Sequence, residues 1–552
     1  MKRRHIPPII VRFLFLTLLI ALNGCGEAPA TTMPSVQNDA GASAATPGPT
    51  QAPAPTSTPE PTATVEPTIT AEPTNTPPPT ETPVPTPTPQ PITLAVAPEL
   101  QEAVAAAIEQ LTGTTYRIDL MVNEDPAATL ADGTAQLALS RGVVGTVVRD
   151  EPLTFTVPFT TNWELISAAD AEAILANGHS LVRVLPWSAM TPDNKALRVD
   201  GLHPTDPDYP YREIWSLAAA GGYEDVATEL APDLTDALAP LPTIRIAAVG
   251  DINYDRSPAY IIQTTGDLAY PLSRVAPVFE AADYTIGNLE TALGDVGEPA
   301  TKRYPFRSPP ETAESLAIGG VDLVSLANNH AQDYGPEALL QGIDLLHAAG
   351  VATVGGGANE AAAYAPHIAD IEGLRVAFLG YVHVPVEAIT HFDTQSWTAT
   401  AGAPGLAWAD PARVSADVAA VRPQVDLVVV ILHSGYEYIE EPSEPQVAAA
   451  RAAVDAGADL VVGHHAHILQ GIHRYNDSVI AYGLGNFLFN IDGPPETGIL
   501  NVWLDQNGVR QIELLPAIIQ EHGQPRLAEF SEAGPILTRV YYLTTLLNAA
   551  NP

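Results

Sequence analysis

Five apolar runs in the second half of the chain each end in a loop whose polar side chains can bind a metal. The runs are "IRIAAVGDIN", "YTIGNLE", "VDLVSLANNH", "LVVVILHSGYEY" and "ADLVVGHHAH". Their β-prone composition predicts strands of an α/β sheet. In open α/β sheets, ligands bind beyond the carboxyl ends of the strands, so we expect the five loops to converge on one place.

The polar side chains of these loops form a mixed set of candidate metal ligands. They are Asp251, Glu290, Asn329, His433, His465 and His467. Carboxylate, amide oxygen and imidazole without soft sulfur suit Mn²⁺, Zn²⁺ or Fe, and we expect one or two such ions. The imidazoles at 464, 465 and 467 are poor core groups, because each has a donor and an acceptor to satisfy once buried. A solvated His-rich loop is the alternative for that cluster alone.

Seven motifs in the same half follow the order of a known family across most of residues 243–490. They are "AVGDINYDR", "GNLETAL", "RYPFRSPP", "VSLANNHAQDYG", "LHSGYEY", "VVGHHAHILQGI" and "IAYGLGNFLF". On these motifs the chain resembles the CapA family, the bacterial capsule and poly-γ-glutamate synthesis proteins. The resemblance implies an α/β, calcineurin-like metallophosphatase fold over residues 241–552, with two packed sheets flanked by helices. Asn507 and Gly508 support it, because they join two apolar runs as an antiparallel hairpin.

The resemblance assigns roles to most of the candidate ligands. Asp251 takes the place of the Asp in the phosphoesterase "GDxH" motif, and Asn329 that of the Asn in "GNH". His433 matches the lone His of the fourth motif, while His465 and His467 match the final "HxH". These last two can both face a metal only if the backbone between them is extended, so we expect a strand-like conformation there.

Two departures from the phosphoesterase pattern concern the number of metals. Asn253 stands where those enzymes have a metal-binding His, and an amide is a poorer ligand than imidazole. "GNLE" replaces a "GD" whose Asp bridges two metals, which leaves open whether Asn288 or Glu290 is the bridge. We therefore expect one metal to bind tightly and a second weakly or not at all.

Other residues near the ligand motifs are candidates for catalysis and substrate binding. A metal centre lowers the pKa of bound water towards about 7, and His330 is the candidate general acid to the leaving group. The alternative is that His330 orients a ligand. The basic segment "TKRYPFR" contains Lys302, and its Arg303 and Arg307 are candidates for binding an anionic group bidentately. A solvated loop is the alternative there, and we expect His464 to lie behind the ligands.

Residues 91–240 alternate short apolar runs with Ala-rich helical patterns, as in "ITLAVAPE" followed by "LQEAVAAAIEQLTG". This alternation predicts a smaller α/β domain with a mainly parallel sheet. The "DYPYREIW" element within it resembles solute-binding proteins of the phosphate-binding type. An accessory domain without a ligand of its own is the alternative.

The start of the chain is predicted to export and tether the protein. Basic residues precede a short apolar segment at 13–21, which is typical of a signal peptide over residues 1–25. "LNGC" resembles a bacterial lipobox, so Cys25 is the expected lipidation site. Residues 26–90 are rich in Pro and Thr and are expected to form a disordered, extended stalk. The protein is therefore expected to be exported and lipid-anchored to the outer face of the cell membrane.

The formal net charge of −39 argues against nucleic acid as a partner, because a phosphate backbone would be repelled. Two functions stay open. One is a metal-dependent hydrolase acting on a phosphoester or a polymer linkage in capsule or poly-γ-glutamate synthesis, export or attachment. The other is a non-catalytic scaffold for an anionic envelope polymer. The resemblance makes other capsule-synthesis proteins further candidate partners.

Overall fold

The computed structural model describes residues 90–111, 116–387, 390–490 and 493–550. Within this part of the chain, no helix is long and apolar enough to cross a membrane. The expected signal peptide, the lipidation site Cys25 and nearly all of the stalk lie outside the described residues and stay predictions.

Eight strands form the first large sheet. They are β10 (Ile244–Ile252), β11 (Tyr284–Leu289), β14 (Leu323–Ser325), β15 (Ala352–Val354), β24 (Asn486–Leu488), β25 (Glu496–Asp505), β26 (Gly508–Ile519) and β27 (Pro525–Leu527). Their order is β15-β14-β11-β10-β25-β26-β27, with β24 pairing against β10. β15, β14, β11 and β10 run parallel, and β25 begins an antiparallel series. The hairpin expected at Asn507 and Gly508 is confirmed, because it joins β25 to β26.

Six strands form the second large sheet. They are β17 (His367–Ile371), β18 (Leu374–His383), β20 (Leu427–Ser434), β21 (Leu460–His464), β22 (Ile472–Tyr475) and β23 (Ser478–Ala481). Their order is β17-β18-β20-β21-β23-β22, and the four inner strands run parallel. Every residue of β20, "LVVVILHS", is buried. An unbroken apolar run is typical of a parallel strand that is covered on both faces.

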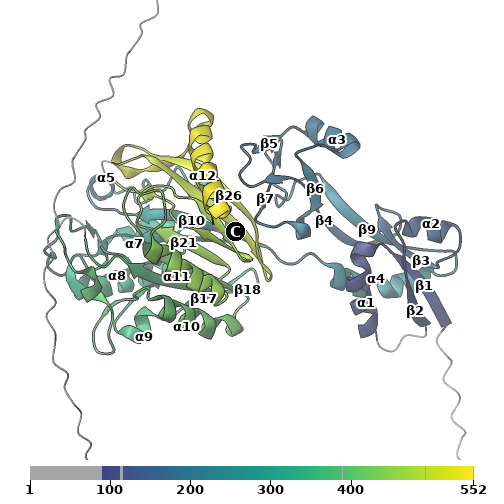
Figure 1. The fold of residues 1–552 in the computed structure, drawn as a ribbon, viewed down its shortest axis with the longest axis horizontal. Helices are drawn as coiled ribbons and strands as arrows, with labels where there is room; N and C mark the ends of the chain where they lie inside the picture. The colour runs from purple at the N-terminus through teal and green to yellow at the C-terminus, as the bar shows by residue number, and fades with distance from the viewer. Residues whose placement is uncertain (1–89, 112–115, 388–389, 491–492, 551–552) are drawn as a thin grey trace, which may run out of the picture. The chain divides into compact units, whose positions relative to one another are not determined.

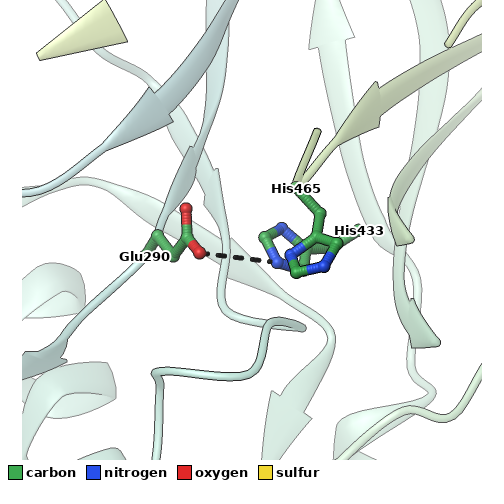
Figure 2. A group of neighbouring side chains, drawn as sticks. All are labelled: Glu290, His433 and His465. Atoms are coloured by element: carbon green, nitrogen blue, oxygen red, sulfur yellow. Dashed lines mark ion pairs between the residues drawn. The ribbon is translucent and has the colours of Figure 1, made fainter. Parts of the chain in front are cut away.

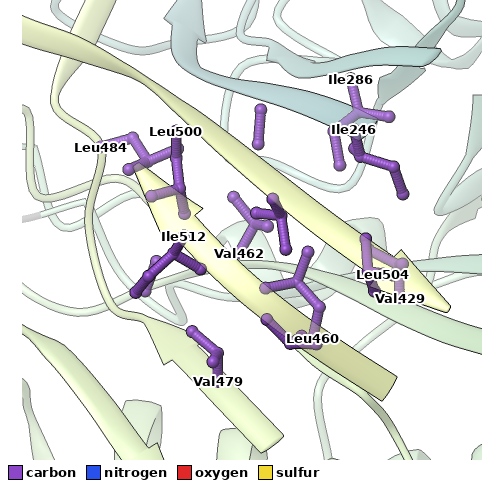
Figure 3. Close-up of a cluster of buried hydrophobic side chains, with 14 of the residues drawn as sticks. Ile246, Ile286, Val429, Leu460, Val462, Val479, Leu484, Leu500, Leu504 and Ile512 are labelled. Atoms are coloured by element: carbon purple, nitrogen blue, oxygen red, sulfur yellow. The ribbon is translucent and has the colours of Figure 1, made fainter. Parts of the chain in front are cut away.

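The two large sheets pack face to face, and the side chains between them form the largest core cluster (Figure 3). Ile246 and Leu500 from the first sheet lie in the same cluster as Val429 and Val462 from the second. Successive side chains of a strand alternate between its faces, so Val430 packs in a different cluster on the other side of β20. Burying each such side chain contributes about 1.5–3 kcal/mol.

Helices cover the outer face of each large sheet (Figure 1). Those on the first sheet are α5 (Ser257–Thr265), α6 (Ala276–Glu280), α7 (Thr312–Ile318) and α8 (Gly335–Ala349). Those on the second are α9 (Glu360–Ala363), α10 (Pro411–Val421) and α11 (Glu444–Asp455). The last helix, α12 (Phe530–Ala550), packs against β22 and β26. The region after residue 240 thus has the two packed sheets flanked by helices that the resemblance implies.

A separate sheet forms from the residues before 241. Its strands are β1 (Gln90–Val96), β2 (Tyr116–Val122), β3 (Leu137–Arg141), β4 (Thr146–Pro158), β6 (Arg183–Pro186), β7 (Asn194–Ala196) and β9 (Arg212–Ala219). Its helices are α1 (Gln101–Gln110), α2 (Pro126–Ala131), α3 (Ala168–Asn177) and α4 (Glu224–Leu238). The order is β2-β1-β3-β9-β4-β6, with β7 pairing against β4.

The expectation of a mainly parallel sheet before residue 241 is wrong. Only the β1–β2 and β1–β3 pairs of this sheet are parallel, and each of these strands is separated from the next by a helix. The pairs that involve β9, β4, β6 and β7 are antiparallel. β3 and β4 do not pair with each other, because β9 lies between them and pairs antiparallel with both.

Short two-stranded pairs complete the fold. They are β5 (Leu165–Ile166) with β8 (Arg198–Val199), β12 (Ala292–Leu293) with β13 (Arg307–Ser308), and β16 (Gly356–Gly357) with β19 (Gly405–Leu406). The β12–β13 pair matters for the site, because it connects the loop after β11 to the basic segment before Ser308. That loop carries Glu290.

Candidate metal centre

The strand ends that were expected to carry ligands do converge, at the carboxyl ends of both large sheets. Asp251 lies near the end of β10, Glu290 follows β11 directly, and Asn329 lies in the loop after β14. From the second sheet, His433 lies near the end of β20 and His465 follows β21. All five side chains are buried. Their strands are paired within rigid sheets, so the sheets themselves position the ligands.

Two groups of donor atoms at this place can each hold a metal ion. One consists of Glu290, His433 and His465, whose side chains point toward one another in Figure 2. The other consists of Asp251, Glu290 and His467, and in each group the donor atoms lie within 4.8 Å of one another. The Oε1 atom of Glu290 is 3.6 Å from His433 Nε2 and 3.9 Å from His467 Nε2. Glu290 is therefore common to both groups.

The buried polar atoms of the cluster fit a bound cation. Neither carboxylate oxygen of Glu290 makes a hydrogen bond with a described residue, and the same is true of Nδ1 of His465. A buried carboxylate that makes no hydrogen bond is costly, and a cation between the donor groups would remove that cost. Asn329 adds an amide oxygen, since its Oδ1 lies 2.7 Å from His433 Nε2. This combination of oxygen and imidazole donors suits Mn²⁺, Zn²⁺ or Fe.

Burial and neighbouring charges set the protonation of these ligands. Burial, followed by the carboxylate of Asp251, raises the pKa of Glu290 well above its usual value. Burial lowers the pKa of His465 to about 3, and the neighbouring His467 adds to this effect. Burial and the nearby His465 likewise hold the pKa of His433 far below its usual value. His433 and His465 are therefore neutral, which is the form of imidazole that binds a metal. His467 differs: burial alone would lower its pKa, but Glu290 and Asp251 raise it to about 10, so His467 must lose a proton when it binds a metal.

His464 lies behind the ligands, in the position expected for it. It belongs to neither donor group among the described residues, and its Nδ1 is 3.2 Å from Asp251 Oδ1. Burial alone would raise the pKa of Asp251, but the contacts from His464 and then His467 hold it well below its usual value. Asp251 is thus a carboxylate, and its two oxygens face different imidazoles.

Asn253 and Asn288, the asparagines of the two motifs that differ from the phosphoesterase pattern, are engaged in hydrogen bonds. Asn288 Nδ2 donates to Asp251 Oδ1 at 2.8 Å, and its Oδ1 accepts from Asn328 Nδ2 at 3.1 Å. Asn253 Nδ2 donates to the backbone carbonyl of Glu290 at 3.0 Å, and its Oδ1 accepts from the backbone N–H of Asp255 at 2.7 Å. Both amides therefore brace the loops around the ligands. The geometry favours Glu290 over Asn288 as the group between two ions.

His330 lies at the margin of the donor groups and is held from behind. Its Nε2 is 4.0 Å from Glu290 Oε1, and its Nδ1 is 2.6 Å from Asp333 Oδ2. Lys302 Nζ donates to Asp333 Oδ1 at 2.7 Å and to the backbone carbonyl of Asn329 at 2.6 Å. The charged side chains of Lys302 and Asp333 are completely buried. Burial lowers the pKa of His330, although Asp333 opposes this.

Sequence reasoning missed the roles of Lys302 and Asp333. Lys302 was only one member of a basic segment, and Asp333 follows His330 in "NNHAQD". The spacing of three residues between His330 and Asp333 was the available signal, because one turn of backbone can bring such side chains together. The ring of Phe306 was missed as well, and it packs 4.4 Å from the His330 ring.

In the described part of the chain, the contacts of the two arginines proposed for substrate binding are to backbone carbonyls and tyrosine rings and not to the ligands. The Arg307 guanidinium donates to the backbone carbonyl of Gly297 at 3.0 Å and stacks 3.5 Å over the Tyr334 ring. Arg303 is exposed and lies 5.2 Å over the ring of its neighbour Tyr304. Arg307 is thus engaged in bracing a loop, whereas Arg303 stays a candidate.

The backbone around the histidine pair is not extended, so that expectation is wrong. His465 has a φ of 83° and His467 a φ of 56°, both in the left-handed region. Such conformations cost on the order of 1–3 kcal/mol each in residues with a side chain, and they persist where the surroundings enforce them. Two left-handed residues, rather than a strand, bring both imidazoles towards Glu290.

Comparisons with known proteins agree with the motifs. Residues 245–491 match the family described as bacterial capsule synthesis protein PGA_cap. The capsule biosynthesis protein CapA of Bacillus anthracis is 32% identical over 307 residues, which cover 53% of this chain and 72% of the relative. The PGA biosynthesis protein CapA of Bacillus subtilis (strain 168) is 30% identical over 282 residues, which cover 50% of this chain and 71% of the relative.

Among solved structures, a hypothetical protein from Thermus thermophilus is matched over 50% of this chain and 98% of its own length, with 16% sequence identity. The TM-score of this match is 0.33. The matched residues 245–491 contain all six candidate ligands, and both CapA relatives are matched over more than two thirds of their length. The chain belongs to the CapA family of bacterial capsule and poly-γ-glutamate synthesis proteins.

Proposed function

We propose that this protein is a metal-dependent hydrolase of the cell envelope that acts on a phosphoester or a polymer linkage in capsule or poly-γ-glutamate synthesis. The observation that carries the proposal is the pair of buried donor groups that share Glu290, with His330 beside them. The relatives named as capsule and PGA biosynthesis proteins support an envelope polymer as the setting.

We assign different roles in hydrolysis to the residues around the donor groups. A metal ion held by Asp251, Glu290 and the imidazoles would polarise an oxygen of the scissile group and lower the pKa of water. In its charged form, which burial disfavours and Asp333 favours, His330 would donate a proton to the leaving group from Nε2, because that atom faces the donor groups. Asp333 holds Nδ1, which orients the ring and stabilises its charged form. A positioned acid of this kind contributes about 10²- to 10⁴-fold to the rate.

A non-catalytic scaffold for an anionic polymer is the second candidate. It is favoured by Asn253, whose amide is engaged on both sides, so that the group of Asp251, Glu290 and His467 has no fourth side chain from that motif. A weakly held second ion would suit binding better than hydrolysis.

We also propose the placement of the protein in the cell. Lipidation at Cys25 would anchor it to the outer face of the membrane, and residues 26–90 would act as a stalk that holds the folded part at a distance. Residues 91–240 would serve as an accessory or solute-binding domain. The support for this placement is the order of the charged start, the apolar segment and the Pro/Thr-rich stretch.

Elemental analysis of purified residues 91–552 separates the two candidate functions. A hydrolase is expected to retain at least one transition metal when the cells grow without supplementation. If the protein contains no such metal, the scaffold is the better description. The same preparation can be assayed on phosphoesters and on poly-γ-glutamate.

The His330→Ala variant tests the chemistry. It is expected to keep its metal and its affinity for substrate while losing at least about 100-fold in turnover, the lower end of what a positioned acid contributes. His347→Ala is a matched control, because His347 is an exposed residue in the last turn of α8. Loss of metal in His330→Ala would show instead that His330 is a ligand or orients one.

A further inference from the structure

Arg256 occupies an unusual backbone conformation between a ligand strand and a helix. It lies between β10, which carries Asp251, and α5, and its φ is 63° with ψ at −115°. A residue with a side chain rarely adopts this conformation, so the surrounding structure must enforce it. The conformation places a guanidinium that is 46% exposed beside the loops of the metal centre.

The charge of Arg256 is not neutralised by a close acceptor. Its one ion pair with a described residue is to Asp255, at 3.8 Å, which is longer than a hydrogen bond. Lys302 and Arg307 differ, because the first is bound to Asp333 and the second to backbone carbonyls. In a chain with a net charge of −39, an unused guanidinium is available to an incoming anion.

The ring of Phe306 links Arg256 to the catalytic margin of the metal centre. The Arg256 guanidinium lies 5.4 Å over this ring, and the same ring packs 4.4 Å from His330. Phe306 also meets Phe489, which packs 5.6 Å from His467. A cation over an aromatic face is held in place without using its N–H donors. The guanidinium donors of Arg256 are therefore free to bind an oxyanion.

A surface hollow of about 610 Å³ opens beside this guanidinium. Arg256 and Arg307 are the basic residues that line it, together with the carboxylates of Asp255, Asp295 and Glu311. Those carboxylates would repel a ligand that carries many negative charges in a row. The hollow therefore suits a single oxyanion group bound at the guanidinium better than a polyanionic tract.

We propose that Arg256 binds one oxyanion of the substrate, a phosphate or a carboxylate of a γ-glutamyl unit, in bidentate fashion. The proposal deepens the proposed function and rests on it, because it assigns the group that presents the scissile bond to the metal centre. It adds a binding residue to Arg303, which is exposed in the neighbouring basic segment.

Calorimetric titration of the full chain, loaded with Mn²⁺, tests the proposal. The probes are inorganic phosphate and, separately, γ-glutamylglutamate. Arg256→Gln is expected to weaken binding of at least one probe by about 10-fold or more, as for loss of a charged hydrogen bond, with metal content unchanged. Arg256→Lys should retain part of the affinity. Arg375→Gln should bind like the wild type. Arg375 is exposed at the start of β18, whereas the metal centre lies at the carboxyl ends of the strands.

The results can identify the class of substrate that supplies the oxyanion, and they can also refute the proposal. An effect on phosphate alone indicates a phosphoester substrate, and an effect on the dipeptide alone indicates a γ-glutamyl substrate. Equal affinities of wild type and Arg256→Gln for both probes, or no binding of either probe by the wild type, would overturn the proposal. If the protein takes up no Mn²⁺, the same titrations without metal still decide whether Arg256 binds an oxyanion, and the elemental analysis for any transition metal decides the hydrolase function.

Discussion

Replacing Glu290 with Gln is the most direct test of the shared ligand. The change keeps the shape of the side chain and removes the charge that both donor groups use. Without metal, that charge is a burden, because burial and then Asp251 raise the pKa of Glu290, and neither carboxylate oxygen makes a hydrogen bond with a described residue, although His467 Nε2 lies 3.9 Å from Oε1. An unpaired buried group costs about 1–3 kcal/mol, so the metal-free variant is expected to exceed the wild type in stability by about 1 kcal/mol or more.

With metal bound, the wild type should instead be more stable than Glu290→Gln. An ion that binds only the folded state adds about 2.7 kcal/mol to stability at a concentration of 100 times its Kd. The wild type is expected to show this gain, whereas Glu290→Gln should show almost none, because it lacks the anion common to both groups. Urea unfolding in EDTA and in excess Mn²⁺ measures the two differences, and elemental analysis measures the ions retained.

Glu298→Gln is the matched control, since Glu298 is an exposed carboxylate in the loop before the basic segment. It should change neither the metal content nor the free energy of unfolding. Two results would refute the reasoning about Glu290: a variant that retains as much metal as the wild type, or a metal-free variant that is less stable than the wild type. Either result would mean that the carboxylate has a structural partner and is not a shared ligand.

Two other changes test the support of the site and the anchor. Asp333→Asn is expected to keep the metal and lower turnover about 10- to 100-fold, the usual effect of removing a group that orients a functional side chain, because His330 loses the partner of its Nδ1. A ratio of kcat values in this range with an unchanged KM would agree with that role, and equal kcat values would contradict it. Cys25→Ala is expected to release the protein from the membrane fraction or to block its processing, which immunoblotting of cell fractions can show. A processed variant that stays in the membrane would disprove the lipid anchor.

The ligand set could be predicted from the sequence because each ligand follows or ends an apolar run. A run such as "LVVVILHS" is long and unbroken, so the strand and its end are both evident, and His433 lies at that end. Parallel strands bring their carboxyl ends to the same edge. Glu290 and Asp251 could be located in the same way, since β11 pairs with β10 in parallel.

Contacts between loops could not be predicted in this way. Lys302 and Asp333 meet in a buried ion pair, yet they lie in different loops, and neither stands at the end of a strand. The antiparallel pairing of β9 and β4 was missed for a related reason. The alternation of strands and helices along the chain does not show that β9, a later strand, inserts between β3 and β4. Pairing partners distant in sequence decide both features.

The choice between Asn288 and Glu290 shows where local pattern stops being informative. The two residues are two positions apart at the end of β11, and on a regular strand such positions face the same side, so either could reach a metal. The two side chains differ in their hydrogen-bond partners. Asn288 is bound by Asp251 and by Asn328, which come from other segments of the chain, whereas no described residue binds the oxygens of Glu290. A buried carboxylate whose oxygens make no hydrogen bond with a described residue, beside an amide whose nitrogen and oxygen both make one, is therefore the group that a cation would complete.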